Sequence, residues 1–224
     1  VLIICLTILF SCSDENNDEE PTITGDITSG LIAYYPFNGN ANDESGNSLD
    51  LTVSGAVLTT GKEGFPNTAY LFNINTDNIS RVATDLLLGT QTTICAWINH
   101  NTLDNFDRLF RLFGSGNSKY GLLWYQNVWA VQAYDASNSR KFWRFTATPT
   151  SAWKFLLVEI ETNTIRFFID NVEQTPSVKD IDAAVSFSSD NFDIHIGNSQ
   201  LGTNAINGKI DNFRIYNRIL TSEE

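Results

Sequence analysis

The chain has 224 residues, 42% of them hydrophobic, and its 14 Lys and Arg residues stand against 26 Asp and Glu residues, which gives a formal net charge of −12. This length and apolar content suit one large all-β domain or two smaller domains. No run of basic residues is available to follow a phosphate backbone, so the composition argues against nucleic acid as a partner.

Residues 1–11 are almost entirely apolar. They are too few to span a bilayer, which needs about 20 residues, and they have the character of the apolar part of an export signal. The sequence Leu9-Phe-Ser-Cys12 resembles a bacterial lipobox, and the acidic run 13–20 resembles the export tag of surface lipoproteins in the Bacteroidetes group. This resemblance implies a lipid at Cys12, a location at the outer membrane or cell surface, and membrane contact through that lipid only. The alternative is an ordinary signal peptide followed by a solvated acidic linker.

Residues 12–29 are polar and acidic, a composition that predicts a flexible tether. Beyond them, short runs of β-branched and aromatic residues alternate with Gly, Asn, Asp and Ser clusters, and no stretch keeps a helical apolar period. We therefore assign residues 30–224 to one all-β domain, built as a sandwich or barrel. Strands are predicted near 31–36, 49–53, 69–72, 78–83, 92–99, 107–113, 119–125, 128–134, 141–147, 154–162, 164–170, 192–197 and 208–216.

A hairpin is predicted around Gln126-Asn127, a dipeptide suited to a tight turn. In this register Trp124 lies opposite Trp129 on one face of the hairpin. The other face carries Leu123, Tyr125, Val128 and Ala130. Both faces are apolar, so one lines the core and the other requires an explanation.

Asp211 lies in the last predicted strand, where a period of two places it on the same face as Phe213 and Ile215. An isolated carboxylate on an inward face is costly to bury, so it must be paired or bound to a cation. The loop 38–47 is rich in Asn and Asp, whose oxygen atoms are the hard ligands that calcium prefers.

Three segments resemble the laminin-G-like domains of the concanavalin-A-like lectin/glucanase superfamily. Residues 31–47 and 208–220 resemble the first and last strands of that family. Residues 153–171 resemble its central hairpin, in which an aromatic-x-Asp-Gly turn closes one strand; here Asn171 replaces the Gly, and Asn also tolerates positive φ. The resemblance covers residues 30–222 and implies a two-sheet antiparallel jelly-roll sandwich.

The resemblance also implies that the two end segments pair and share one structural calcium ion. The candidate calcium ligands are Asp43, Asp211, Asn38 and Asn47. The alternative is an Asx-turn network in the loop, with Asp211 paired to a nearby arginine such as Arg214.

Aromatic residues are concentrated in the middle of the chain, between Phe106 and Phe155. Sugar rings present apolar C–H faces that pack on aromatic rings, so some of these residues are candidates for a carbohydrate-binding surface. The candidates are Trp124, Trp129, Tyr134 and Trp143. The alternative is that these large side chains fill the core of the sandwich.

No catalytic residues are predicted. Glu159-Ile-Glu161 lacks the third acid of the Glu-x-Asp-x-x-Glu strand found in glucanases of this architecture. Asp193-Ile-His195 keeps only the Ile-His pair of the Gln-Ile-His strand in related alginate lyases. A nucleophile elbow and a phosphate-binding loop are both missing from the sequence. Cys95, within an apolar strand, is predicted to be a buried and inert thiol.

Together these features predict a non-catalytic carbohydrate-binding module of a bacterial cell-surface lipoprotein, with a glycan or polysaccharide as partner and calcium as a structural cofactor. The alternatives are an adhesion or protein-binding module of the same fold and a divergent glycoside hydrolase or polysaccharide lyase. The acidic balance also predicts weak binding to highly anionic polysaccharides, since like charges slow and weaken encounter.

Overall fold

The computed structural model describes residues 25–82, 86, 88–102, 104, 106–114, 117–135, 137–146, 151–161, 164–179, 192–198 and 204–224. The predicted signal, Cys12 and most of the tether lie outside these ranges. Within them, no helix is long and apolar enough to cross a membrane. The strands are β1 (Leu31–Tyr35), β2 (Thr52–Ser54), β3 (Val57–Thr59), β4 (Ala69–Phe72), β5 (Asn78–Arg81), β6 (Gln91–Thr102), β7 (Arg108–Gly114), β8 (Asn117–Tyr125), β9 (Val128–Tyr134), β10 (Arg140–Phe145), β11 (Lys154–Glu161), β12 (Thr164–Ile169), β13 (Val172–Glu173), β14 (Pro176–Lys179), β15 (Phe192–Ile196) and β16 (Asn207–Tyr216).

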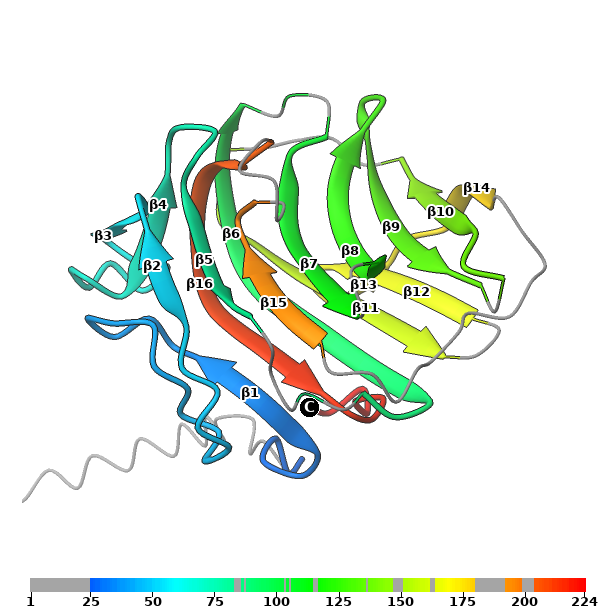
Figure 1. Ribbon diagram of the computed structural model, residues 1–224, viewed down its shortest axis with the longest axis horizontal. Coiled ribbons are helices and arrows are strands. Elements are labelled where there is room, and N and C mark those ends of the chain that lie inside the picture. The colour runs from blue at the N-terminus through cyan, green and yellow to red at the C-terminus, as the bar shows by residue number, and fades with distance from the viewer. Residues whose placement is uncertain are drawn as a thin grey trace, which may run out of the picture.

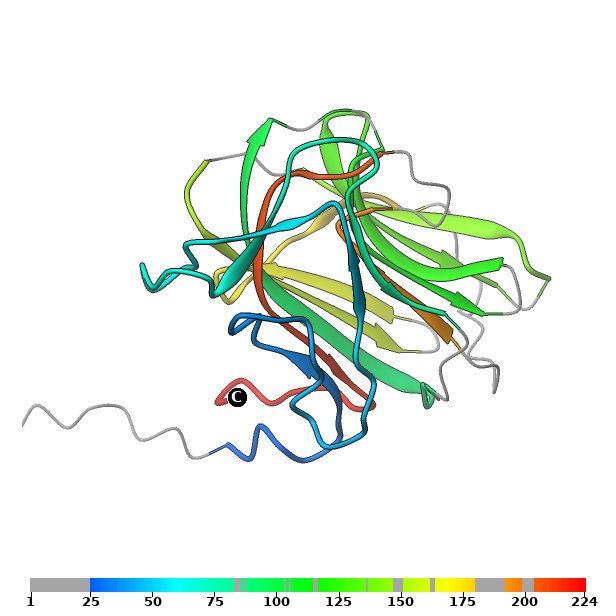
Figure 2. The ribbon, with the colours of Figure 1, turned by 60° about the vertical axis from the view of Figure 1, so that its left-hand side comes forward.

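The strands form two antiparallel sheets that pack against each other (Figures 1 and 2). The back sheet has the order β13-β12-β11-β6-β16-β4-β3, with β1 also paired to β16. The front sheet has the order β14-β10-β9-β8-β7-β15-β5-β2, which Figure 1 shows running from β2 and β5 across to β10 and β14. The predicted all-β sandwich is confirmed, and each sheet has one face toward the other sheet and one outer face.

The two ends of the domain meet in the back sheet, as predicted. β1 runs antiparallel to β16, so that Ala33 lies opposite Ile215 and Tyr35 lies opposite Phe213. All four side chains are fully buried. The first and last strands of the domain are therefore adjacent. The buried side chains of this seam between β1 and β16 hold the two ends of the domain together.

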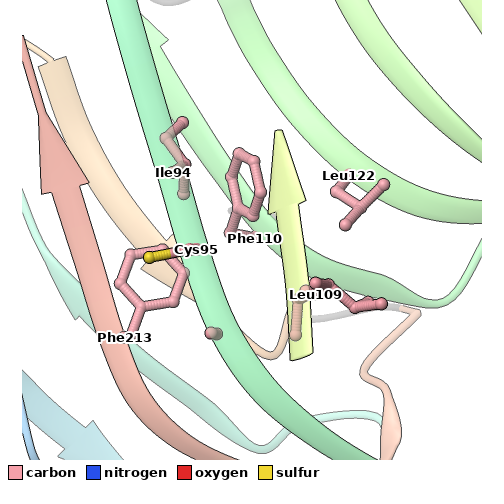
Figure 3. A pocket seen from close by; sticks show the side chains of 8 residues that line it. Ile94, Cys95, Leu109, Phe110, Leu122 and Phe213 are labelled. Carbon is pink, nitrogen blue, oxygen red and sulfur yellow. The ribbon is translucent and has the colours of Figure 1, made fainter. Parts of the chain in front are cut away.

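The space between the sheets is filled by the inward side chains of alternating strand residues. Figure 3 shows part of this interior, where Leu109, Phe110 and Leu122 of the front sheet approach Ile94 and Phe213 of the back sheet. The gap between them is too small for a water molecule, so this part of the core offers no ligand cavity.

Cys95 is buried beside this interior, as predicted, with 3% of its surface exposed. Burial raises the pKa of its thiol to about 12, so the thiol stays protonated at neutral pH. Because the thiolate is the reactive form, this cysteine is inert.

Strand positions follow the predictions closely, with one shift and three omissions. The strand expected at 49–53 begins later, as β2, because side chains hold the backbone of Leu49 in a loop: its N–H donates to Asp43 Oδ2 at 3.0 Å and its carbonyl accepts from the Tyr35 hydroxyl at 2.8 Å. The unpredicted strands β3, β13 and β14 have only 3, 2 and 4 residues. Strands this short carry too few residues for an alternating pattern to be recognised.

Two predicted turns have the expected backbone, and a third, at Thr162-Asn163 between β11 and β12, lies outside the described residues. Gln126 and Asn127 have φ values of 53° and 65°, and Asp170 and Asn171 have φ values of 50° and 64°. Two consecutive residues with positive φ are typical of a type I′ hairpin turn. Asn171 therefore does take the place of the Gly that the family resemblance leads one to expect.

Candidate functional site

Asp43 organises the loop that was predicted to supply calcium ligands. Its Oδ1 accepts hydrogen bonds from the backbone N–H groups of Tyr34 and Ser45, both at 2.9 Å. Its Oδ2 accepts from the Ser45 hydroxyl at 2.8 Å and from the backbone N–H of Leu49 at 3.0 Å. Four donors therefore surround the carboxylate and tie the loop to β1.

The two predicted amide ligands, Asn38 and Asn47, are both exposed. The Asn47 side-chain nitrogen donates to the carbonyl oxygen of Ile32 at 2.8 Å and to that of Leu31 at 3.3 Å. Asn47 therefore fixes the loop against β1 through its amide nitrogen.

Asp211 does not face the core, which corrects the prediction made from its period-two position. A β-bulge at Asn212, whose φ is 55°, shifts the register of β16 against β6. Because the bulge adds one residue, Ile210 and Phe213 both lie in the core, while Asp211 lies opposite Trp97 on the outer face of the back sheet.

The carboxylate of Asp211 is covered by the neighbouring segment 61–62. Its Oδ2 accepts the backbone N–H of Lys62 at 2.9 Å, and burial raises the pKa of the carboxyl group. Gly61 permits this approach, because a Cβ at that position would lie 2.7 Å from the same oxygen. Arg214, the partner predicted in the alternative interpretation, donates instead to Oδ1 of Asn212 at 3.1 Å.

The carboxylates of Asp43 and Asp211 thus face N–H donors, whose partial positive charge disfavours a cation at the same positions. Asp211 is bound by the segment 61–62, which precedes β4; β4 pairs with residues 208–210 of β16, whereas β1 pairs with residues 213–216 of the same strand. No group of three or more His, Cys, Asp and Glu side chains in the described ranges is arranged to hold a metal ion. Calcium binding stays a prediction, and the hydrogen bonds favour the Asx-turn network around Asp43.

Trp124, Trp129 and Trp143 lie in the core, each with 3% of its surface exposed, so the prediction that they form a sugar-binding surface is corrected. Trp124 and Trp129 do lie opposite each other, with an edge contact of 5.5 Å between ring centroids. Trp129 also reaches Phe167 of the back sheet, at 6.4 Å. The second sheet covers these indoles, and of the predicted set only Tyr134 is partly exposed.

The outer face of the same hairpin carries a second, smaller apolar cluster, which we call the aromatic patch. Its members are Phe106, Leu123, Tyr125, Ala130 and Phe142. The ring of Tyr125 stacks on that of Phe142 at 5.1 Å and contacts that of Phe106 at 5.0 Å. Phe106 and Tyr125 are half-buried, so part of each ring reaches solvent. The patch explains why both faces of this hairpin are apolar in the sequence.

Polar side chains cross the outer face of the front sheet beside the aromatic patch. Backbone pairing brings His195 of β15 next to Arg111 of β7, which is next to Gly121 of β8 and then Gln132 of β9. Phe142 of the aromatic patch follows Gln132 on β10. We call the polar set the basic row, and its members are Arg108, Arg111, Gln132, Tyr134, Arg140 and His195.

Arg108 reaches past Gly121 toward Gln132 in the basic row. Its Nη1 lies 3.9 Å from the position that a Cβ of Gly121 would take, and the same atom donates to Oε1 of Gln132 at 3.2 Å. The side-chain nitrogen of Gln132 donates in turn to the hydroxyl oxygen of Tyr134, also at 3.2 Å. The tighter constraint on Gly121 comes from the carbonyl oxygen of Phe110, which would lie 3.1 Å from such a Cβ.

Arg108 and Arg111 are partly withdrawn from water, and neither has a carboxylate partner among the described residues. Burial lowers the pKa of each to about 10, and for Arg108 the neighbouring charge of Arg111 adds to this effect, so both stay protonated at neutral pH. None of the ion pairs between described residues includes either arginine. The Nε atoms of both are buried and have no hydrogen-bond partner in the described structure.

His195 is a further member of the basic row whose buried nitrogen atoms lack hydrogen-bond partners among the described residues. The residue is 3% exposed, and its ring packs edge-on against Phe113 with 5.3 Å between centroids. Burial lowers the pKa of the imidazole, which is therefore neutral at pH 7. Neither ring nitrogen has a hydrogen-bond partner among the described residues, and buried polar atoms of this kind require an explanation.

The order of the strands and the two facing sheets place the protein among jelly-roll domains of the lectin type. The chain belongs to the Concanavalin A-like lectin/glucanases superfamily, whose sequence pattern matches residues 73–224. No curated protein sequence matches the chain.

Several solved structures have the same fold. Domain 4 of an extracellular arabinanase from Geobacillus stearothermophilus, in complex with arabinotriose, is 20% identical with a TM-score of 0.61, and the match covers 86% of this chain and 94% of that domain. The receptor binding domain of botulinum neurotoxin D is 17% identical with a TM-score of 0.64, covering 88% and 52%. The binding domain of Paraclostridial Mosquitocidal Protein 1 is 14% identical with a TM-score of 0.66, covering 88% and 51%. The chain thus spans about half of each toxin domain, and at these identities the similarity establishes the fold alone.

Proposed function

We propose that the chain is a non-catalytic carbohydrate-binding domain that holds a glycan on the outer face of its front sheet. The observation that carries the proposal is the placement of the aromatic patch beside the basic row on that face, where Phe142 pairs with Gln132. Exposed parts of aromatic rings pack on the apolar faces of sugars, and a few fixed polar groups bind their hydroxyls. The family and the arabinotriose complex of a structural neighbour support this function.

The acids considered for catalysis support the non-catalytic part of the proposal. Glu159 lies on the back sheet, where Arg166 approaches its Oε2 to 2.8 Å. Glu161 accepts a hydrogen bond from Gln91 at 2.8 Å. Both acids are held by other side chains on the sheet opposite the basic row, so neither is placed to act on a sugar bound there.

Substitution of the aromatic patch tests the proposed function. We expect Tyr125→Ala to weaken retention on immobilised polysaccharides, arabinan among them, by about tenfold, because a stacked ring contributes on the order of 1 kcal/mol. Tyr34→Ala is the matched control: Tyr34 is also half-buried and also lies under an arginine, but on the back sheet. Full retention by Tyr125→Ala, or an equal loss in both variants, would contradict the proposal.

The proposal also places the domain on a bacterial surface, attached through a lipid at Cys12 and the tether 12–29. The lipobox-like sequence and the acidic run that follows it support this location. Incorporation of labelled fatty acid into the full-length protein, and its loss in Cys12→Ala, would test the anchor. Release of the unmodified protein into the medium by wild-type cells would count against it.

The second candidate function is an adhesion or protein-binding module of the same fold. The similarity to toxin domains described as receptor-binding favours it. Such a module would use its loops, so we expect Tyr125→Ala to leave its binding unchanged.

A further inference from the structure

We infer that the basic row recognises the anionic group, a carboxylate or a sulfate ester, of an acidic sugar within the bound glycan. This inference rests on the proposed function and names the class of ligand.

The local charge of the segment from β7 to β10 in the front sheet is opposite to that of the whole chain. Between Asp107 and Phe145 the sequence has six basic and two acidic residues, although the net charge of the chain is −12. One of the two acids, Asp135, lies 3.3 Å from Lys141. The other, Asp107, accepts the backbone N–H of Asp104 at 2.7 Å. Neither acid of this segment pairs with an arginine of the basic row. A third acid, Asp193 of β15, acts on His195, whose pKa it raises, and is not among the groups that shift the pKa of Arg108 or Arg111.

The chemistry of the row selects an anion over a neutral or cationic group. An arginine has five N–H donors and no acceptor, and its planar fork matches the two oxygens of a carboxylate. Arg108 and Arg111 supply such donors next to each other, and Arg140 adds a third guanidinium at the rim. Charge-assisted hydrogen bonds to a carboxylate or sulfate are about twice as strong as bonds to neutral sugar hydroxyls.

The cost of the arrangement indicates that it serves binding rather than folding. Arg108 is 7% exposed, yet its Nε has no partner and its Nη1 bonds only to a neutral amide among the contacts described. A buried cation without a counter-charge destabilises a protein, and an apolar residue of similar size is usually as good or better for the fold. Groups perturbed in this way are concentrated at functional sites, where a ligand supplies the missing charge.

The overall acidity of the chain does not prevent this recognition. Six of the 26 acidic residues precede Gly30, in and beside the tether. At physiological ionic strength, charges separated by more than about 8 Å are largely screened, so the local field at the basic row is set by nearby charges, which are its three arginines and Asp193. The inference is therefore opposite to the expectation, drawn from net charge alone, that highly anionic polysaccharides bind weakly.

Titration of three polysaccharides into the purified domain tests the inference: polygalacturonate, dextran sulfate and neutral arabinan. EDTA is included so that metal ions cannot bridge acidic groups. We expect Arg111→Gln to weaken the binding of an acidic polysaccharide by tenfold or more, by loss of a charge-assisted hydrogen bond, and to weaken arabinan binding by a clearly smaller factor, since a neutral sugar loses only an ordinary hydrogen bond. We also expect added salt to weaken acidic binding by the wild type more than by the variant. Preference for polygalacturonate or for dextran sulfate identifies the anionic group.

Two further variants keep the test independent of folding. Arg214→Gln removes a half-buried arginine from the back sheet and should not change binding. Arg108→Met should abolish acidic binding while the melting temperature stays equal or rises. A lower melting temperature for Arg108→Met with unchanged binding would show a purely structural arginine and overturn the inference.

The outcomes also separate the inference from the proposed function. Binding of arabinan without binding of either acidic polysaccharide would overturn the inference and leave the proposed function in place. Equal losses in Arg111→Gln and Arg214→Gln would overturn the inference as well. Failure of all three polysaccharides to bind would overturn both.

Discussion

The two sheets differ in how the charged side chains on their outer faces are paired. On the back sheet two ion pairs match charged side chains: Nη2 of Arg166 lies 2.8 Å from Oε2 of Glu159, and Nζ of Lys154 lies 2.5 Å from Oδ2 of Asp170. On the front sheet no ion pair among the described residues reaches the two inner arginines of the basic row. Paired charges serve the fold, whereas unpaired buried donors leave charge for a partner to neutralise. The contrast supports the proposal that the ligand binds on the front sheet.

The largest expected effect tests whether the stability of the front sheet comes from its inner face. Trp129→Ala should lower the free energy of unfolding by about 3–5 kcal/mol, because it removes a large ring from the core. Tyr125→Ala, on the outer face of the same hairpin, should cost less than about 2 kcal/mol, since its ring is half-exposed and the core is untouched. Urea unfolding measures both values. Similar losses would mean that the outer face is also part of the fold's main core.

The next prediction concerns the removal of one partner of an ion pair on the back sheet. Arg166→Met should lower the free energy of unfolding by about 2 kcal/mol, because it leaves Glu159 buried without its counter-charge. The contact is an ion pair without hydrogen-bond alignment, and the Arg166 side chain is 37% exposed, so the full cost of a buried pair is not expected. Arg108→Met on the front sheet should cost nothing. If both variants lose stability equally in urea unfolding, the two faces do not differ in the way described.

A smaller effect distinguishes the Asx-turn network from calcium. Asp43→Asn should lower the free energy of unfolding by about 1 kcal/mol, since the amide replaces one of the two acceptor oxygens with a donor. With N–H groups already neutralising the carboxylate, EDTA followed by calcium should leave the melting temperature of the wild type unchanged. A rise on adding calcium that disappears in Asp43→Asn would support the predicted ion instead.

The strands and their pairing could be predicted because each sheet buries one face. Alternating apolar residues then mark a strand, and the end segments could be paired through their resemblance to a known family. The bulge at Asn212 could not be predicted, because Asn is common in every loop of this sequence and a single inserted residue leaves the apolar pattern intact. That one residue turned Asp211 from the core to the outer face.

The site was harder to predict than the fold. The pattern placed Trp124 opposite Trp129, but both faces of their hairpin are apolar, and only the second sheet decides which face becomes the core. Gln132 and His195 are widely separated in the sequence from Arg111, and the strand order β9-β8-β7-β15 brings them into one row. The sequence alone does not show that polar residues from separate strands will lie next to each other in the sheet.

The smallest expected effect concerns Asp107, which directly precedes the basic row. Burial raises the pKa of this carboxyl group from 3.8 to about 6, and Arg108 is not among the causes of the shift. Because the folded state holds the proton more tightly than the unfolded state, the contribution of Asp107 to stability improves as the pH falls through about 6 and is least favourable above it. Asp107→Asn should therefore raise the free energy of unfolding at pH 7 by about 1 kcal/mol or less, and the gain should vanish near pH 4.

Urea unfolding of wild type and variant across this pH range measures the difference and cancels the other titrating groups. If Asp107 were instead the missing counter-charge of the basic row, its pKa would be lowered by pairing with Arg108. The sign of the result would then be opposite, and Asp107→Asn would destabilise the protein at pH 7 and not at low pH. The sign of this small difference therefore decides whether Asp107 neutralises the arginines of the front sheet.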